Sequence, residues 1–186
     1  MHTYIPERCD CMAMQIIELN GTQITFDKEK TKLHRTSYNE PCDCQDCRNY
    51  YQYVAGNREL VAFLDSFGVD YHCAEELMSF SLGEESDSEI HHIASYTVVG
   101  TIEKEIKLEH DQFGMDISFE KAATDAFDRT AINTDCPEPY FWIVVEDIVP
   151  YVLDEKREIT ENPMLKFKNF LKRSKKPITS IFSRSC

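Results

Sequence analysis

The chain has 186 residues, of which 42% are hydrophobic and 11% are aromatic. This length suits one domain, and this apolar content is enough for a sizeable core, which excludes a chain that is disordered throughout. No stretch approaches the ~18 continuous apolar residues of a membrane-spanning helix.

Charge is unevenly distributed along the chain. All 33 acidic residues lie at or before Glu161, and seven of the 20 basic residues follow it. Residues 1–163 therefore carry 13 basic against 33 acidic residues, or −20, and residues 164–186 carry +7. The acidic body should repel nucleic-acid phosphates and anionic lipids, so nucleic acid is not an expected partner.

The first ten residues, MHTYIPERCD, contain neither a positive segment feeding an apolar run nor a cleavage site. We therefore expect a cytoplasmic protein. In that compartment the eight cysteines are expected to be reduced thiols or metal ligands, not disulfides.

The pattern predicts three segments. Residues 1–13 form an N-terminal arm, residues 14–160 form a single α+β domain, and residues 161–186 form a basic amphipathic tail. In the domain, two short helices are expected to pack on a mainly antiparallel sheet or sandwich.

Residues 14–26, MQIIELNGTQITF, predict a β-hairpin. Its turn is Asn20-Gly21, because both central residues of a type I′ turn need positive φ. A further strand is predicted from Thr31 to Tyr38.

Two short helices are predicted next. Asp43 is the expected N-cap of the first, which should begin near Cys44. Asn57 is the expected N-cap of the second, from Arg58 to Phe67, whose apolar residues follow helical spacing. Gly68 should end it, since a residue without Cβ readily adopts the left-handed conformation.

The second half of the chain predicts mostly strands. After a single turn at Ala74 to Leu77, the expected strands are 78–82, 90–102 with a continuation towards Leu108, 115–119 and 140–145. On the long strand, His91 and His92 should point to opposite faces. Trp142 is expected to be buried, and residues 120–135 should form a short helix or an ordered loop.

The densest chemistry is the pattern C-x-C-x-x-C formed by Cys42, Cys44 and Cys47. Cysteines three apart at the start of a helix project from one face, as ligands of a tetrahedral zinc ion must. The three thiols therefore predict a zinc site. The fourth ligand would come from Cys9, Cys11, His34, His72, Cys73 or Cys136.

Two other interpretations of the thiols stay open. Free cysteines in a reduced cell are often buried as small apolar residues. Alternatively, Cys44 or Cys47 serves as a redox group or nucleophile, with His34 or His72 as the base. Asp43 and Asp46 would oppose this chemistry, because negative charge beside a thiol disfavours the thiolate.

The run YNEPCDCxxCRNYY, followed by ELVxFLxxFGVD, resembles the N-terminal part of a family of small bacterial proteins of unknown function. The segment EPYFWIVVEDIVPYVLDE resembles the last strand of that family. The resemblance covers about two thirds of the chain and implies no activity. Cys9, Cys11 and the tail lie outside it.

The tail begins with Asn162-Pro163, a favourable helix start. Apolar and basic residues alternate after it, so the tail could lie on an anionic membrane surface or bind an acidic protein partner. The alternative is that the tail docks on the acidic body of its own chain or frays, since chain ends are commonly loose.

Sequence motifs of common enzymes are absent: there is no phosphate-binding glycine loop, G-x-S-x-G or H-E-x-x-H. The carboxylate pairs Glu146 with Asp147 and Asp154 with Glu155 are assigned to the solvated surface, since neighbours on a strand face opposite ways. The function expected is a non-enzymatic binding or structural module with a zinc site, and a thiol-dependent enzyme or redox protein is the alternative.

Overall fold

The computed structural model describes residues 14–36, 41–81, 89–122, 136 and 139–157. The predicted arm, the predicted tail and residues 123–135 lie outside the described residues. The chain divides into two compact units, residues 1–156 and 157–186, and the fold below is that of the first. Within the described residues, every helix is too short or too polar to cross a membrane.

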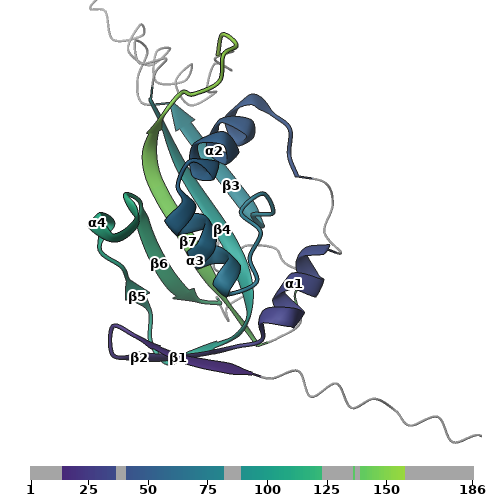
Figure 1. The fold of residues 1–186 in the computed structure, drawn as a ribbon, viewed down its shortest axis with the longest axis vertical. Helices are drawn as coiled ribbons and strands as arrows, with labels where there is room; N and C mark the ends of the chain where they lie inside the picture. Colours follow the sequence, from purple (N-terminus) through teal and green to yellow (C-terminus); the bar gives the residue numbers. More distant parts are fainter. Residues whose placement is uncertain (1–13, 37–40, 82–88, 123–135, 137–138, 158–186) are drawn as a thin grey trace, which may run out of the picture. The chain divides into compact units, whose positions relative to one another are not determined.

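In the described part of the chain, seven strands form one antiparallel sheet in the order β1-β2-β4-β7-β6-β5, with β3 also paired to β4 (Figure 1). The strands are β1 Gln15–Leu19, β2 Thr22–Phe26, β3 Glu76–Ser81, β4 Glu89–Ile102, β5 Ile106–Lys107, β6 Asp116–Lys121 and β7 Tyr140–Pro150. The long β4 is central, since it pairs with β7 on one side and with β3 and β2 on the other. The hairpin and the strands predicted for the second half of the chain are thus confirmed. The turn predicted at Ala74 to Leu77 is wrong from Glu76 onward, where β3 pairs with β4.

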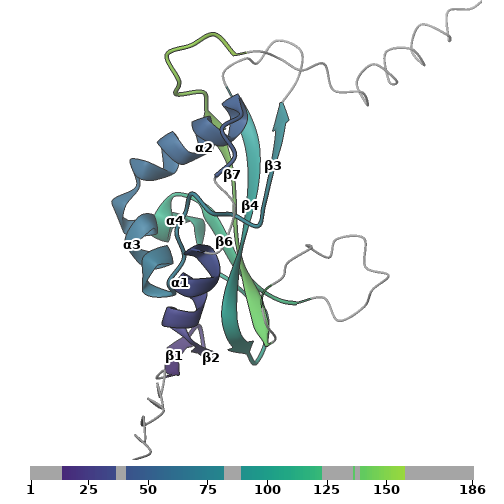
Figure 2. The ribbon, with the colours of Figure 1, turned by 90° about the vertical axis from the view of Figure 1, so that its right-hand side faces the viewer.

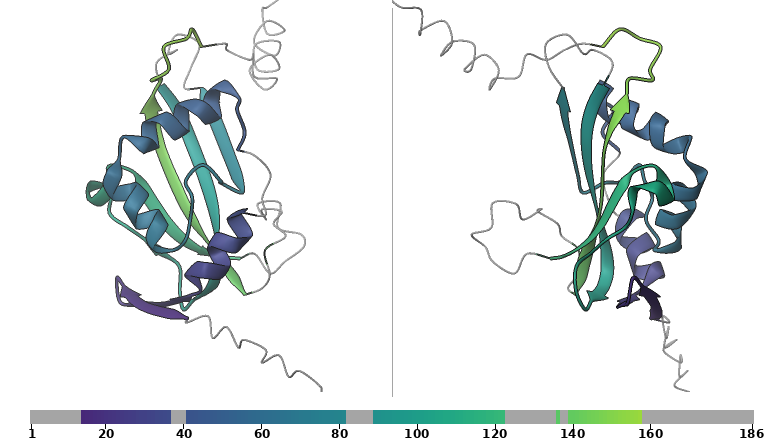
Figure 3. Two further views of the ribbon diagram at one scale, coloured as in Figure 1. Left: turned by 45° about the vertical axis from the view of Figure 1, so that its right-hand side comes forward. Right: turned by 90° about the vertical axis from the view of Figure 1, so that its left-hand side faces the viewer.

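Three helices lie on one face of this sheet (Figures 2 and 3). These helices are α1 Lys28–Thr36, α2 Gln45–Ala55 and α3 Arg58–Ser66, and a short fourth helix, α4 His110–Phe113, lies between β5 and β6 in the chain. The buried apolar side chains of α2 and α3 join those of the sheet in one hydrophobic cluster. The α+β class, with short helices on a mainly antiparallel sheet, is confirmed.

The hairpin of β1 and β2 forms as predicted. Asn20 and Gly21 both have positive φ, 47° and 67°, as a type I′ turn requires. Its register pairs Leu19 with Thr22 directly across the turn.

The strand predicted from Thr31 to Tyr38 is wrong, because α1 occupies residues 28–36. Asp27 caps this helix: its carboxylate accepts from the Lys30 amide at 2.9 Å. Thr31 lies one turn later, where its hydroxyl donates to the Asp27 carbonyl at 2.9 Å and accepts from the Val99 amide at 3.1 Å. The buried positions of α1 are polar. The helix therefore has no apolar stripe that would reveal it in the sequence.

Successive side chains of β4 point to opposite faces of the sheet, as predicted. His92 is fully buried on the helix side, and its Nδ1 lies 2.9 Å from the Ser79 hydroxyl. His91 lies on the other face, where its Nε2 is 2.7 Å from Glu146. Trp142 is buried, as expected, at 5% exposure, and it is paired with Thr97 on the face away from the helices.

The end of α3 depends on Gly68. Asn57 caps the start of α3 by accepting from the Leu60 amide at 3.1 Å, as predicted. Gly68 follows the last turn with φ +84°, and a Cβ there would overlap the Lys28 carbonyl. The absence of a side chain therefore lets α1 and α3 approach closely.

We expect Gly68→Ala to destabilise the fold more than Gly114→Ala. Gly114 also has positive φ, +62°, but a Cβ there would meet nothing within 4 Å. The control should cost about 1–2 kcal/mol for the left-handed backbone alone. Urea denaturation measures both variants, and equal losses would contradict the close approach at Gly68.

Candidate metal centre

The three thiols lie at the start of α2, whose position is fixed by buried polar contacts. Asn49 is fully buried. Its side-chain Nδ2 donates to the Pro150 carbonyl at 3.1 Å, and its side-chain Oδ1 accepts from the Val152 backbone amide at 2.7 Å. These bonds fasten the middle of α2 to the chain leaving β7.

Tyrosines hold the inner side of α2. The Tyr50 and Tyr96 hydroxyls lie 2.9 Å apart, and Tyr96 donates to the Tyr71 carbonyl at 3.0 Å. Because the single proton of Tyr96 goes to Tyr71, Tyr50 must donate to Tyr96. Burial raises the pKa of both phenols, so both stay neutral and keep their donor roles.

The first turn of α2 begins at Cys44, which is the N-cap, with φ −61° and ψ 156°. Its carbonyl accepts from the Arg48 amide at 2.9 Å, and its side chain makes no capping bond. The prediction that Asp43 caps α2 is therefore wrong. The Asp43 carbonyl instead accepts from Arg48 Nε at 2.9 Å.

The structure brings together the three thiols of the motif. The Sγ atoms of Cys42, Cys44 and Cys47 all lie within 4.8 Å of one another. Cys42 and Cys44 are exposed and Cys47 is buried. Sulfurs around one tetrahedral zinc ion are separated by about 3.8 Å when zinc–sulfur bonds are ~2.3 Å. The thiols can therefore close on a zinc ion by small side-chain movements.

Cys42 and Cys47 differ in how readily their thiols lose a proton. The Cys44 backbone amide, followed by the Cys44 thiol, lowers the pKa of Cys42 by hydrogen bonding. Burial raises the pKa of Cys47, and its hydrogen bonds to Cys44 and Cys42 raise it further. Cys42 is thus more easily converted to a thiolate than Cys47, and Cys47 needs a cation beside it to ionise.

None of the other predicted ligands that the structure describes joins this cluster. Among the described residues, the set of mutually close ligand atoms contains only the three motif cysteines. His34 Nε2 lies 2.9 Å from the buried Glu75 carboxylate, and His72 Nδ1 lies 3.0 Å from Asp70. Cys73 is half-buried and Cys136 is buried, both outside the set. Cys9 and Cys11 lie outside the described residues.

Sequence reasoning missed an aromatic wall beside the thiols. Tyr51 follows Cys47 by four residues, so the two side chains share one face of α2. Burial raises the pKa of Tyr51, and the charges of Cys47, Cys42, Cys73 and Cys44 raise it further. The Tyr51 ring lies 5.4 Å from that of His72, which lies 3.9 Å from that of Tyr71. The four-residue spacing of Cys47 and Tyr51 was the feature of the sequence that could have predicted this neighbour.

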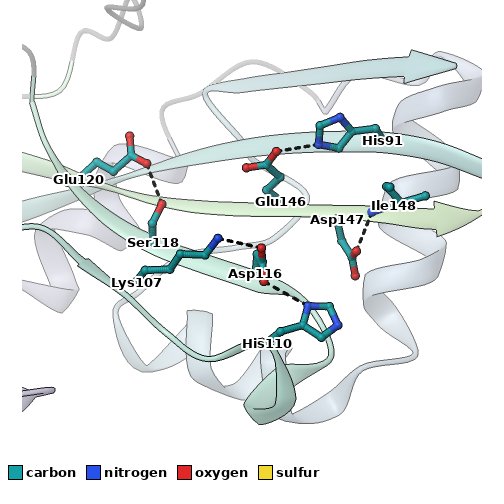
Figure 4. A network of polar contacts seen from close by, with 9 residues as sticks. All are labelled: His91, Lys107, His110, Asp116, Ser118, Glu120, Glu146, Asp147 and Ile148. Carbon is teal, nitrogen blue, oxygen red and sulfur yellow. Dashed lines mark hydrogen bonds and ion pairs between the residues drawn. The ribbon is translucent and has the colours of Figure 1, made fainter. Parts of the chain in front are cut away.

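The carboxylates of β6 and β7 have separate partners (Figure 4). Glu146 meets His91, and Asp147 accepts from the Ile148 amide at 2.7 Å. A hydrogen bond from Lys107 holds the pKa of Asp116 below its usual range, with a weaker contribution from His110. Glu146 and Asp147 therefore have different partners, and they do not form an acid/base pair.

Comparison of the chain with protein-family models, with curated proteins and with solved structures finds no match. The resemblance to a family of small bacterial proteins therefore stays a prediction. A proposal about the function therefore rests on the geometry of the thiols.

We expect Tyr96→Phe to cost more stability than Tyr50→Phe. Tyr50→Phe removes one neutral hydrogen bond, worth about 1 kcal/mol. Tyr96→Phe leaves both the Tyr50 hydroxyl and the Tyr71 carbonyl without their bonds, at about 1–3 kcal/mol for each orphaned group. Chemical denaturation of the two variants gives the order, and a reversed order would disprove the assigned donor direction.

Proposed function

We propose that Cys42, Cys44 and Cys47 hold a zinc ion, and that this chain is a non-enzymatic binding or structural module built around it. The observation that carries the proposal is the mutual approach of three sulfurs within 4.8 Å. Thiolates are the soft ligands that zinc prefers in structural sites.

The position of the thiols gives the zinc a structural task. Cys42 precedes α2, Cys44 is its N-cap, and Cys47 lies in its first turn. An ion bound to all three would tie the incoming chain to a helix that Asn49 and Tyr50 already fasten to the sheet. Metal binding of this kind adds its free energy to that of folding.

The electrostatics also favour a cation at this place. Burial raises the pKa of Cys47, and the thiolates of its neighbours would raise it further. A divalent ion reverses this balance, because a coordinating thiol is deprotonated outright. The positive end of the α2 dipole adds to the stabilisation of the thiolates.

A thiol-dependent enzyme is a weaker proposal on the same geometry. Cys47 is buried and its pKa is raised, whereas a nucleophilic cysteine needs a lowered pKa and access to substrate. His34 and His72, the bases considered for such chemistry, contact Glu75 and Asp70.

Protein purified without chelator should contain about one equivalent of zinc, since structural sites hold their ion tightly. Cys47→Ser should lower zinc affinity more than 100-fold, because even the loss of a group supporting a ligand costs ~10–100-fold. Elemental analysis and competition with a chromogenic chelator measure the two quantities.

Cys136→Ser is the matched control. Cys136 is buried to the same degree as Cys47, at 7% and 6% exposure, but it lies outside the thiol cluster. The control should retain its zinc. Less than about a tenth of an equivalent in the unmodified protein, or equal affinity in both variants, would refute the zinc site.

A further inference from the structure

We propose that the zinc ion keeps one exchangeable coordination position, which binds an uncharged nitrogen donor, the imidazole of a histidine on a partner protein. Water holds the position in the partner's absence. This inference rests on the proposed zinc site and names the chemistry of the partner that completes it.

The donors that the structure describes number three, one fewer than a structural zinc ion takes. Zinc takes four ligands, and a site with three protein ligands keeps the fourth for water or an incoming group. Among the described residues, only Cys42, Cys44 and Cys47 have ligand atoms that lie mutually close.

The exposure of the thiols gives the open position a direction. Cys47 is buried at 6% exposure, whereas Cys42 and Cys44 are exposed. An ion resting on all three has the protein beneath it and solvent on the side of the two exposed sulfurs. An incoming side chain can therefore reach the ion without opening the fold.

Charge selects a neutral ligand. Three thiolates and one Zn²⁺ carry a net charge of −1, and the carboxylates of Asp43 and Asp46 lie next to the motif in the chain. A fourth thiolate or a carboxylate would add another negative charge to an acidic surface, which costs free energy. Neutral imidazole avoids this cost and is a common zinc ligand.

The aromatic side chains beside the thiols favour a ligand with a planar ring. Tyr51 shares a helix face with Cys47 and stands beside the thiols, and the rings of His72 and Tyr71 continue the wall. Aromatic rings attract one another in offset or tilted arrangements. An imidazole bound to the ion can pack against Tyr51.

The test uses the full chain loaded with Co²⁺ in place of zinc, because the visible bands of Co²⁺ report its ligands. Titration with imidazole should shift these bands in a saturable, one-to-one manner as imidazole replaces water. Bands that do not respond would overturn the inference, since a side chain of the protein would then fill the fourth position. The zinc site itself would stand in that case, because it is judged by metal content and by Cys47→Ser.

A variant at Tyr51 tests whether the bound imidazole packs against this ring. Tyr51→Leu should weaken imidazole binding about two- to tenfold, the usual worth of an aromatic contact, and leave zinc content unchanged. Tyr53→Leu is the control, since Tyr53 is also half-buried on α2 but lines a cavity with Gln52 and Gly56. Equal imidazole affinity in the two variants would contradict the assigned role of Tyr51.

Discussion

The fastening of α2 to the sheet is the constraint on which the site depends. The buried Asn49 amide binds the chain beyond β7 at two points, and the Tyr50 hydroxyl joins a chain of bonds that ends at the Tyr71 carbonyl. These contacts fix the first turn of the helix. Cys47 is thereby held below the surface while Cys42 and Cys44 stay exposed above it, and the three sulfurs lie within 4.8 Å of one another.

Features encoded by neighbouring residues could be predicted from the sequence. The Asn20-Gly21 turn and the Asn57 cap of α3 both form because a few adjacent residues favour one backbone conformation. Helix α1 could not be found in the same way. Its buried residues Thr31 and His34 are polar, and their partners, the Val99 amide and Glu75, are distant in sequence.

The site was predictable to the same extent. Spacing alone placed Cys42, Cys44 and Cys47 together, because all three lie within one turn of a helix start. It could not decide whether His34, His72 or another residue joins them, since that depends on how separate segments pack. In the structure, both histidines are bound to carboxylates instead. The result is a thiol cluster with an exposed side and an aromatic neighbour, which we propose binds a metal ion and then a partner.

X-ray absorption at the zinc edge tests the central claim most directly, because it gives the number and kind of atoms bound to the ion. The account predicts three sulfurs at ~2.3 Å and one nitrogen or oxygen at ~2.0–2.1 Å. A shell of nitrogen and oxygen atoms alone would contradict it, because the motif cysteines would then not hold the metal.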